Sequence, residues 1–299
     1  MKAAGLCHSD LSVMDGNLPR PTPMVLGHEA AGIVKAVGEG VHDLEEGDHV
    51  VTVFVPSCGH CAPCAEGRPA LCEPAAVANN AGTLISGARR LHRQDGTDVH
   101  YHIGVSAFAE YAVLSRNSLV KVDAELPLHH AALFGCAVLT GVGAAINSAD
   151  IKAGQTVAVV GLGGVGLNSM LGALVAGATE VLAIDLDDDK LALAKKLGAT
   201  HVFSSGEEGC VDKIKAATNG GVDCAIEMAG SEKALELAYL VTRRGGITVT
   251  GGLPHPDKKV AIQQVNLVAE ETHPEGQLLA HSRCLPLHRP VPSGKTSCG

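Results

Sequence analysis

From residue 156 to residue 250, the chain alternates between short apolar runs and stretches whose apolar positions recur at helical spacing. The apolar runs predict buried strands, and the periodic stretches predict helices that pack on them. Such alternation predicts a doubly wound α/β domain, in which helices cover both faces of a parallel sheet. The expected elements are a strand at 156–160, a helix at 164–176, a strand at 181–184, a helix at 188–197, a strand at 223–227, a helix at 231–241 and a strand at 246–250.

The chain before this region follows another pattern. Its apolar runs are short and are separated by glycines and prolines, which predicts a β-rich domain with strands at 31–37, 48–55 and 108–114. From residue 272 onward no apolar period is visible and proline recurs, so we expect a poorly ordered tail. The pattern therefore predicts a first domain at 1–138, a second domain at 139–271 and a tail at 272–299.

Composition narrows the function classes. Hydrophobic residues make up 46% of the chain and aromatic residues only 2%, so the core must consist mainly of Val, Leu, Ile and Ala. A net charge of -9 argues against nucleic acid as the main partner. Residues 153–179 are uncharged and long enough to span a bilayer, but their glycines favour a strand, a turn and a buried helix, so no membrane span is expected. Because no apolar run typical of a signal peptide is visible at the N-terminus, we expect a cytoplasmic protein.

Four cysteines with the spacing C-x2-C-x2-C-x7-C predict a closed metal site in the first domain. Cys58, Cys61, Cys64 and Cys72 offer four soft thiolate ligands, which is the donor set of a structural zinc. Two disulfides in a secreted loop are the alternative, which is less favoured because nothing else in the chain indicates secretion. The spacing predicts a metalloprotein but does not identify a reaction.

A glycine motif follows the first strand of the second domain. Gly161, Gly163 and Gly166 form G-x-G-x-x-G between an apolar strand and a predicted helix, which is the setting of a dinucleotide-binding turn. Gly164 and Val165 complete the motif. Because a helix begins there, its free N–H groups and positive dipole end would face the pyrophosphate of the cofactor.

An acidic stretch follows the next predicted strand. Asp185 ends that strand, where its carboxylate can accept hydrogen bonds from both ribose hydroxyls; the alternative is that it caps a helix. Four carboxylates within residues 185–189 would repel a 2′-phosphate, which favours NAD over NADP. Lys190 would either cover the ribose or remain a solvated helix residue, and both interpretations stay open.

Three further candidate metal ligands, Cys7, His28 and Cys136, are far apart in the sequence. Taken singly, Cys136 is more simply a buried structural cysteine. Taken together with the other motifs, however, the chain resembles the zinc-dependent medium-chain alcohol dehydrogenases from about Lys2 to about Glu271. The resemblance rests on the order and spacing of Gly5-Leu6-Cys7-His8-Ser9-Asp10, Gly27-His28-Glu29, the four-cysteine segment, Gly135-Cys136 and the glycine motif with Asp185.

This resemblance implies a GroES-like catalytic domain that binds two zinc ions and a Rossmann domain that binds NAD. Cys7, His28 and Cys136 would hold a catalytic zinc and leave one position open for water or substrate. Asp10 would orient His28, and Glu29 would approach the metal transiently. The remaining implied roles are a proton acceptor at Ser9, a pyrophosphate contact at His8, nicotinamide contacts at Thr140 and Val165, and a substrate-pocket wall at Phe54, for which ordinary core packing is an equal alternative.

The implied reaction is transfer of hydride from a primary or secondary alcohol to NAD, giving an aldehyde or ketone. Ser12 stands where some members carry a histidine that passes the proton to solvent, and Ala76 stands where the glutathione-adduct class carries an arginine, so a plain alcohol is favoured. We also expect the GroES-like domain to be incomplete at the start of the chain, and the strand that joins subunits in this homo-oligomeric family to be lost. Two alternatives remain: an inert truncated fragment that binds zinc with or without NAD, and a zinc-ribbon binding module fused to a Rossmann domain.

Overall fold

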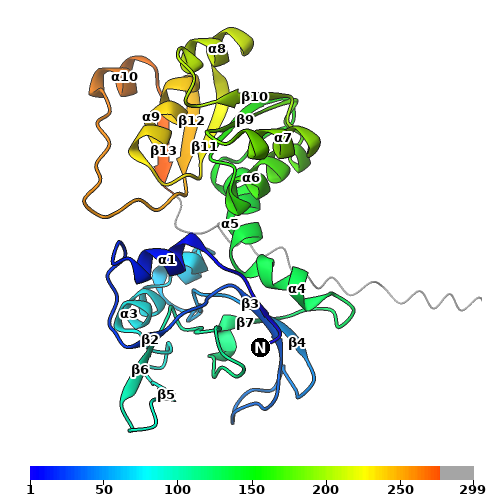
Figure 1. Cartoon of the computed structure of the whole chain (residues 1–299), viewed down its shortest axis with the longest axis vertical. Coiled ribbons are helices and arrows are strands. Elements are labelled where there is room, and N and C mark those ends of the chain that lie inside the picture. The colour runs from blue at the N-terminus through cyan, green and yellow to red at the C-terminus, as the bar shows by residue number, and fades with distance from the viewer. Residues whose placement is uncertain (277–299) are drawn as a thin grey trace, which may run out of the picture.

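The computed structural model describes residues 1–276 and shows two lobes joined by a helical connection (Figure 1). In Figure 1 the first lobe holds small sheets and short helices, whereas the second holds one large sheet with helices on both of its sides. The chain crosses from one lobe to the other through α4 (Leu128–Ala131) and α5 (Ala137–Gly143). The predicted boundary between residues 138 and 139 therefore falls inside α5.

The first lobe contains a four-stranded antiparallel sheet of order β1-β3-β4-β7 and a three-stranded sheet of order β2-β6-β5. Small residues such as Ala31 and Ala132 and the aliphatic Val51 pack the four-stranded sheet against α4. The strands are β1 (Ala3–Ala4), β2 (Met24–Val25), β3 (Ala30–Ile33), β4 (His49–Thr52), β5 (Leu91–His92), β6 (Asp98–Tyr101) and β7 (Leu119–Lys121), and the other helices are α1 (His8–Met14), α2 (Ala62–Ala65) and α3 (Glu73–Ala81).

The second lobe is a six-stranded sheet of order β10-β9-β8-β11-β12-β13, in which every neighbouring pair is parallel. Alternate residues of β8 point to opposite faces. Val157 and Val159 pack with Met170 of α6 on one face, whereas Ala158 and Val160 pack on the other with residues of α8 and α9. The elements are β8 (Thr156–Val160), α6 (Gly164–Val175), β9 (Glu180–Asp185), α7 (Asp188–Lys196), β10 (His201–Ser204), α8 (Cys210–Ala217), β11 (Val222–Glu227), α9 (Glu232–Val241), β12 (Thr242–Thr250), α10 (Gln264–Ala269) and β13 (His273–Gly276).

This arrangement confirms the predicted α/β class, with a doubly wound parallel sheet in the second lobe. The predicted order of strands and helices from residue 156 to residue 250 is present, and α8 and β10 are additional elements that were not predicted. β12 begins at Thr242 rather than at residue 246. In the described residues no single helix is long and apolar enough to cross a membrane, although the bent pair 128–135 and 137–148 passes by length and composition alone.

The first lobe contains less β-strand than the sequence pattern predicts. β3 and β4 are shorter than the predicted strands at 31–37 and 48–55. The segment 108–114 forms no strand, which corrects the prediction made there. Its start is bound to the loop before β3 instead, because the amides of Ala107 and Phe108 donate to the carbonyls of Gly27 and Leu26 at 2.9 and 3.0 Å.

The prediction of a poorly ordered tail from residue 272 is wrong for its first residues. Residues 273–276 form β13, which pairs with β12 at the edge of the six-stranded sheet. All four of these residues are exposed, so the strand forms through its backbone ladder and leaves no apolar pattern in the sequence. Thr272 precedes it as a buried anchor, with its hydroxyl 3.1 Å from that of Tyr239. The remainder of the predicted tail lies outside the described residues.

Candidate active site

Three side chains from separate parts of the first lobe form one cluster. The ligand atoms of Cys7, His28 and Cys136 all lie within 4.8 Å of one another, and His28 Nε2 is 3.4 Å from the Cys136 sulfur. Cys7 immediately precedes α1, His28 lies two residues before β3, and Cys136 immediately precedes α5. The structure therefore brings together the three residues that the sequence resemblance alone had linked.

Two glycines explain why the chain can approach itself so closely here. Gly27, just before His28, has a φ of +93°, and a Cβ on it would lie 2.7 Å from the backbone nitrogen of Phe108. Gly135, just before Cys136, packs directly on β4, where an added Cβ would lie 2.6 Å from the carbonyl oxygen of Thr52. Any side chain at these two positions would push a predicted ligand out of the cluster.

The ionisable groups of the cluster offset one another's charges. The thiol of Cys136 donates a hydrogen bond to Cys7, and together with His28 this lowers the pKa of Cys7 although burial opposes the shift. The pKa of Cys136 is raised in return, first through that hydrogen bond and then through burial. Burial would lower the pKa of His28, but its contacts with Asp10 and Cys7 outweigh burial and raise it. A thiolate beside an imidazolium is the state from which a divalent cation can displace protons.

Asp10 is the buried carboxylate that holds this cluster in place. Its Oδ1 accepts a hydrogen bond from the amide of Gly27 at 3.0 Å and lies 3.4 Å from His28 Nδ1, while its Oδ2 accepts from the amide of Cys7 at 3.2 Å. Burial would raise the pKa of Asp10, but its contacts with His102 and His28 outweigh burial and keep the pKa low. The carboxylate thus stays ionised and ties two predicted ligands together.

The cluster fits a zinc ion by its chemistry. Two sulfurs and one imidazole nitrogen are ligands that zinc prefers, and three protein ligands are typical of a catalytic zinc. Tetrahedral coordination at ordinary Zn–S and Zn–N lengths places a sulfur and a nitrogen about 3.5 Å apart. The 3.4 Å between His28 Nε2 and the Cys136 sulfur agrees with that spacing.

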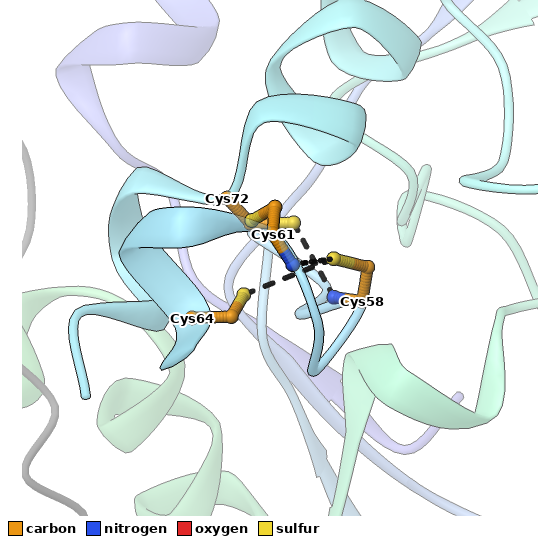
Figure 2. A group of neighbouring side chains, drawn as sticks. All are labelled: Cys58, Cys61, Cys64 and Cys72. Atoms are coloured by element: carbon orange, nitrogen blue, oxygen red, sulfur yellow. Dashed lines mark hydrogen bonds between the residues drawn. The ribbon is translucent and has the colours of Figure 1, made fainter. Parts of the chain in front are cut away.

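The four-cysteine segment brings its four sulfurs close together (Figure 2). Figure 2 shows Cys58, Cys61, Cys64 and Cys72 turned toward one another, with the sulfurs of Cys58 and Cys64 4.0 Å apart. This distance is about twice a disulfide bond, and all four are free cysteines, which favours the metal interpretation over the disulfide one. Backbone amides of Cys61 and Cys58 donate to the sulfurs of Cys58 and Cys72, each at 3.3 Å.

Short helices position these cysteines. Cys61 immediately precedes α2, and Cys72 immediately precedes α3. The pKa of Cys58 is lowered to about 6, first by a backbone hydrogen bond from His60. Burial raises the pKa of Cys72 to about 12, so a metal ion would be needed to ionise all four thiols.

The glycine motif forms the predicted turn between β8 and α6. Gly161 has a φ of +91°, and a Cβ on Gly166 would lie only 1.8 Å from the carbonyl oxygen of Gly161, so both positions require glycine. Gly163 differs, because a Cβ there would meet nothing within 4 Å. The open side of the turn is therefore at Gly163, which precedes the first residue of α6, as a turn that admits a phosphate requires.

Asp185 ends β9 beside this turn. Its Oδ2 accepts a hydrogen bond from the amide of Leu162 at 2.6 Å, and its Oδ1 accepts from the amide of Leu186 at 2.8 Å. Lys190 lies nearby, with Nζ 3.7 Å from Asp185 Oδ1. The helix cap of α7 is Asp187, whose side chain accepts from two amides of the first turn. The helix-cap alternative considered for Asp185 thus applies to Asp187.

Contact between α5 and α6 joins the two predicted sites. A Cβ on Gly141 would lie 2.3 Å from the carbonyl oxygen of Val165, and one on Gly164 would lie 3.8 Å from Ala137. Glu29 also reaches this junction, because its Oε1 accepts a hydrogen bond from the amide of Ala137 at 2.8 Å. The residue after Cys136 is therefore beside the glycine turn, and the buried Thr140 lies on the same helix.

The other predicted residues surround the cysteine–histidine cluster. The ring of Phe54 stands edge-on to His28, with ring centroids 5.1 Å apart, and also packs in an apolar cluster, so both interpretations of Phe54 keep their support. His8 and Ser9 form the first turn of α1, where His8 is exposed and Ser9 is half-buried. The amide of Ser9 donates to the sulfur of Cys7. Burial raises the pKa of Glu29, which lies next to His28 in the sequence.

Sequence reasoning missed His102. Its Nδ1 is 3.0 Å from Asp10 Oδ1, although the ring is not aligned for a linear hydrogen bond, and it belongs to a second group of possible ligands with Asp10 and His28. No motif in the sequence includes His102, so no local signal could have identified it.

Comparison with known proteins covers both lobes. The family model of the alcohol dehydrogenase GroES-like domain matches residues 1–124, and that of the zinc-binding dehydrogenase matches residues 164–286. The second match continues beyond Glu271, so the expectation that the resemblance stops there is wrong. The first match includes Cys7, His28 and the four-cysteine segment, and the second includes Gly164, Val165 and Gly166 of the glycine motif together with Asp185.

Individual relatives agree with these matches. "Putative alcohol dehydrogenase D" of Mycobacterium tuberculosis is 39% identical over 279 residues, which are 92% of this chain and 75% of the relative. The crystal structure of benzyl alcohol dehydrogenase from Acinetobacter calcoaceticus is 34% identical with a TM-score of 0.86, over 95% of this chain and 78% of that one. A "putative zinc-binding dehydrogenase" of Sinorhizobium meliloti, solved with NADP, is 29% identical with a TM-score of 0.74, over 94% and 76% of the two chains.

These relationships assign zinc, a nicotinamide cofactor and small alcohol or aldehyde substrates at the level of the family. They agree with a cysteine–histidine cluster and a dinucleotide turn that adjoin across the contact of α5 and α6. The chain is therefore an oxidoreductase and belongs to the zinc-binding alcohol dehydrogenase family.

Proposed function

We propose that this protein transfers hydride from a primary or secondary alcohol to NAD, giving an aldehyde or a ketone. The contact between α5 and α6 carries the proposal, because it holds the predicted metal ligand Cys136 beside the turn at Gly164 and Val165. Hydride transfer needs its donor and acceptor carbons adjacent, so a metal site and a dinucleotide turn on touching helices are the arrangement that it requires.

Cys7, His28 and Cys136 would hold the catalytic zinc, and the four cysteines at 58, 61, 64 and 72 would hold a second, structural zinc. When bound, the first zinc supplies a Lewis acid that acidifies an alcohol, and the nicotinamide supplies the hydride acceptor. The amides of Cys7 and Gly27 fix the Asp10 carboxylate, whose Oδ1 lies 3.4 Å from His28 Nδ1 and so orients that ring. Glu29 holds the start of α5 through the amide of Ala137.

The first turn of α1 would handle the proton that the alcohol loses. Ser9 is half-buried two positions after Cys7, so its Oγ is the nearest predicted acceptor in sequence. His8 is exposed and precedes it, as a group that contacts a pyrophosphate should be. Phe54, with its ring against His28, would form one wall of the substrate pocket.

NAD is favoured over NADP by the residues after β9. Asp185 accepts a hydrogen bond from the glycine turn with Oδ2 and one from the amide of Leu186 with Oδ1, and Asp187 is fixed as the cap of α7. A 2′-phosphate would have to enter next to these carboxylates, which repel it. The Nζ of Lys190 lies 3.7 Å from Asp185 Oδ1 and pairs with that carboxylate, so its charge is less available to a 2′-phosphate.

The decisive experiment measures metal content and turnover on one purified preparation. We expect two zinc ions per chain and an alcohol-dependent increase in reduced-nicotinamide absorbance with NAD, much weaker with NADP. Benzyl alcohol is the first substrate to try, followed by short primary and secondary alcohols, because a benzyl alcohol dehydrogenase is among the similar structures. Cys7→Ser should abolish turnover and remove one zinc but leave NADH binding unchanged.

Each competing interpretation has its own result. Two zinc ions and tight NADH binding without turnover on any alcohol would favour the inert fragment. One zinc ion per chain that Cys7→Ser does not affect would favour a zinc-ribbon binding module. A preference for NADP would overturn only the argument from the acidic stretch. The proposed oxidation of an alcohol would be unaffected.

A further inference from the structure

We propose that His102 is a positioning residue that fixes the orientation of the predicted metal ligand His28 by acting through Asp10. The inference rests on the proposed function, because it takes His28 as a ligand of the catalytic metal. It concerns a residue that no motif in the chain had marked and that does not itself reach the cysteine sulfurs.

The geometry places two imidazoles on one carboxylate. His102 Nδ1 lies 3.0 Å and His28 Nδ1 lies 3.4 Å from the same oxygen, Asp10 Oδ1. The two rings are perpendicular, with centroids 5.3 Å apart, so each approaches Asp10 from its own direction. Both histidines are 1% exposed and Asp10 is 4% exposed, so water has little access to any of the three.

Burial makes the contact from His102 consequential. A buried carboxylate must obtain its partners from the protein, and the closest side-chain nitrogen to Asp10 belongs to His102 rather than to His28. Asp10 also accepts from the amide of the predicted ligand Cys7 and from that of Gly27, the residue before His28. Without His102, the carboxylate would turn toward its remaining donors and change the direction in which it holds the His28 ring.

The loop that carries His102 is built to keep it there. Ile103 and Ser106, neither of which is glycine, have φ values of +42° and +57°, and Gly104 between them has +72°. Ser106 secures the loop, because its Oγ accepts from the amide of His102 at 2.9 Å and donates to the carbonyl of Val25 at 2.8 Å. Left-handed conformations at non-glycine residues persist only where the surroundings enforce them, and they concentrate at functional sites.

The test uses full-length protein with both zincs bound and three variants. His102→Leu removes the contact, and His102→Asn keeps an N–H group near the position of Nδ1 at smaller size. His92→Leu is the matched control, because His92 makes a similar pair with Asp98 at 2.9 Å on the exposed part of the first lobe. Two readouts are needed: zinc retention per site against a chelator, and the absorption spectrum after cobalt replaces the more labile zinc.

We expect His102→Leu to lose its more labile zinc roughly tenfold more readily and to shift the cobalt spectrum, at the lower end of the range for partners of metal ligands. His102→Asn should restore most of both properties, and His92→Leu should match the wild type. The four-cysteine zinc should stay bound in every variant and thereby report that the first lobe is folded. If His102→Leu fails to fold, the comparison of His102→Asn with His92→Leu decides, since the proposal requires near-normal retention and spectrum in both.

The inference fails if His102→Leu keeps wild-type retention and spectrum, or if His102→Asn is as defective as His102→Leu while still folded. These results leave the proposed function standing, because the wild type would still bind two zincs. A wild type with a single zinc, held by the four cysteines, would instead remove the catalytic metal itself and the inference with it.

Discussion

At the scale of single residues, Gly163 is the position in the glycine turn where a side chain would meet only open space. Its φ and ψ of −69° and −174° are extended and suit alanine as well as glycine. Gly163→Ala should therefore change the free energy of unfolding by no more than about 1 kcal/mol, because the loss of a glycine cap and the stiffer unfolded chain nearly cancel. The added methyl should nevertheless weaken NADH binding at least about tenfold, since the pyrophosphate must approach the backbone there.

Fluorescence titration with NADH and urea unfolding of the same variant measure both effects. Gly38→Ala is the matched control, because an added Cβ there also meets nothing within 4 Å but lies in the first lobe, away from the turn. It should bind NADH like the wild type. Unchanged affinity in Gly163→Ala would show that the cofactor does not use this face of the turn.

At the scale of elements, the contact between α5 and α6 would transmit the position of the proposed metal site to the proposed cofactor turn. Gly141→Ala would bring a Cβ within 2.3 Å of the Val165 carbonyl oxygen and 2.6 Å of Asn168 Cβ, so the helices must separate. We expect a loss of about 1–3 kcal/mol in unfolding free energy, as is usual for overpacking a tight contact. Turnover should fall further than this loss explains, because the separation moves the turn away from Cys136.

Urea unfolding and steady-state kinetics on the same preparation test this expectation. Gly164→Ala serves as the stability control, because its Cβ would lie at an ordinary 3.8 Å from Ala137 across the same pair of helices. Its free energy of unfolding should be close to that of the wild type. A Gly141→Ala protein with wild-type stability and turnover would mean that the two helices are not a rigid link.

The elements differ in how well they could be predicted from the sequence. The four cysteines and the glycine turn were predictable because each signal is confined to a few neighbouring residues. His28 and Cys136 are 108 positions apart, so only a family resemblance could join them, and His102 has no motif at all. Strand β13 was missed because its residues are exposed, and 108–114 was mistaken for a strand because its apolar residues are not part of a ladder.

At the scale of the whole molecule, the buried core on the six-stranded sheet of the second lobe includes Cys224, which is 1% exposed. Burial raises the pKa of Cys224 from 9.0 to about 12. The folded state therefore binds the thiol proton more tightly than the unfolded state does. This contribution to stability is complete below about pH 9 and is lost as the pH rises toward 12.

Between pH 8 and pH 10, the wild type should lose about 1.4 kcal/mol of unfolding free energy through Cys224 alone. Cys224→Ala removes the titrating group, so its stability, although lower at both values, should fall by that much less over the same interval. Urea unfolding under reducing conditions at the two pH values gives the four free energies required. Val159→Ala is the control, because it truncates a buried residue of the same core cluster without removing a thiol, and it should keep the full wild-type pH dependence. Equal slopes in Cys224→Ala and the wild type would mean that the thiol gains access to water before the sheet unfolds as a unit.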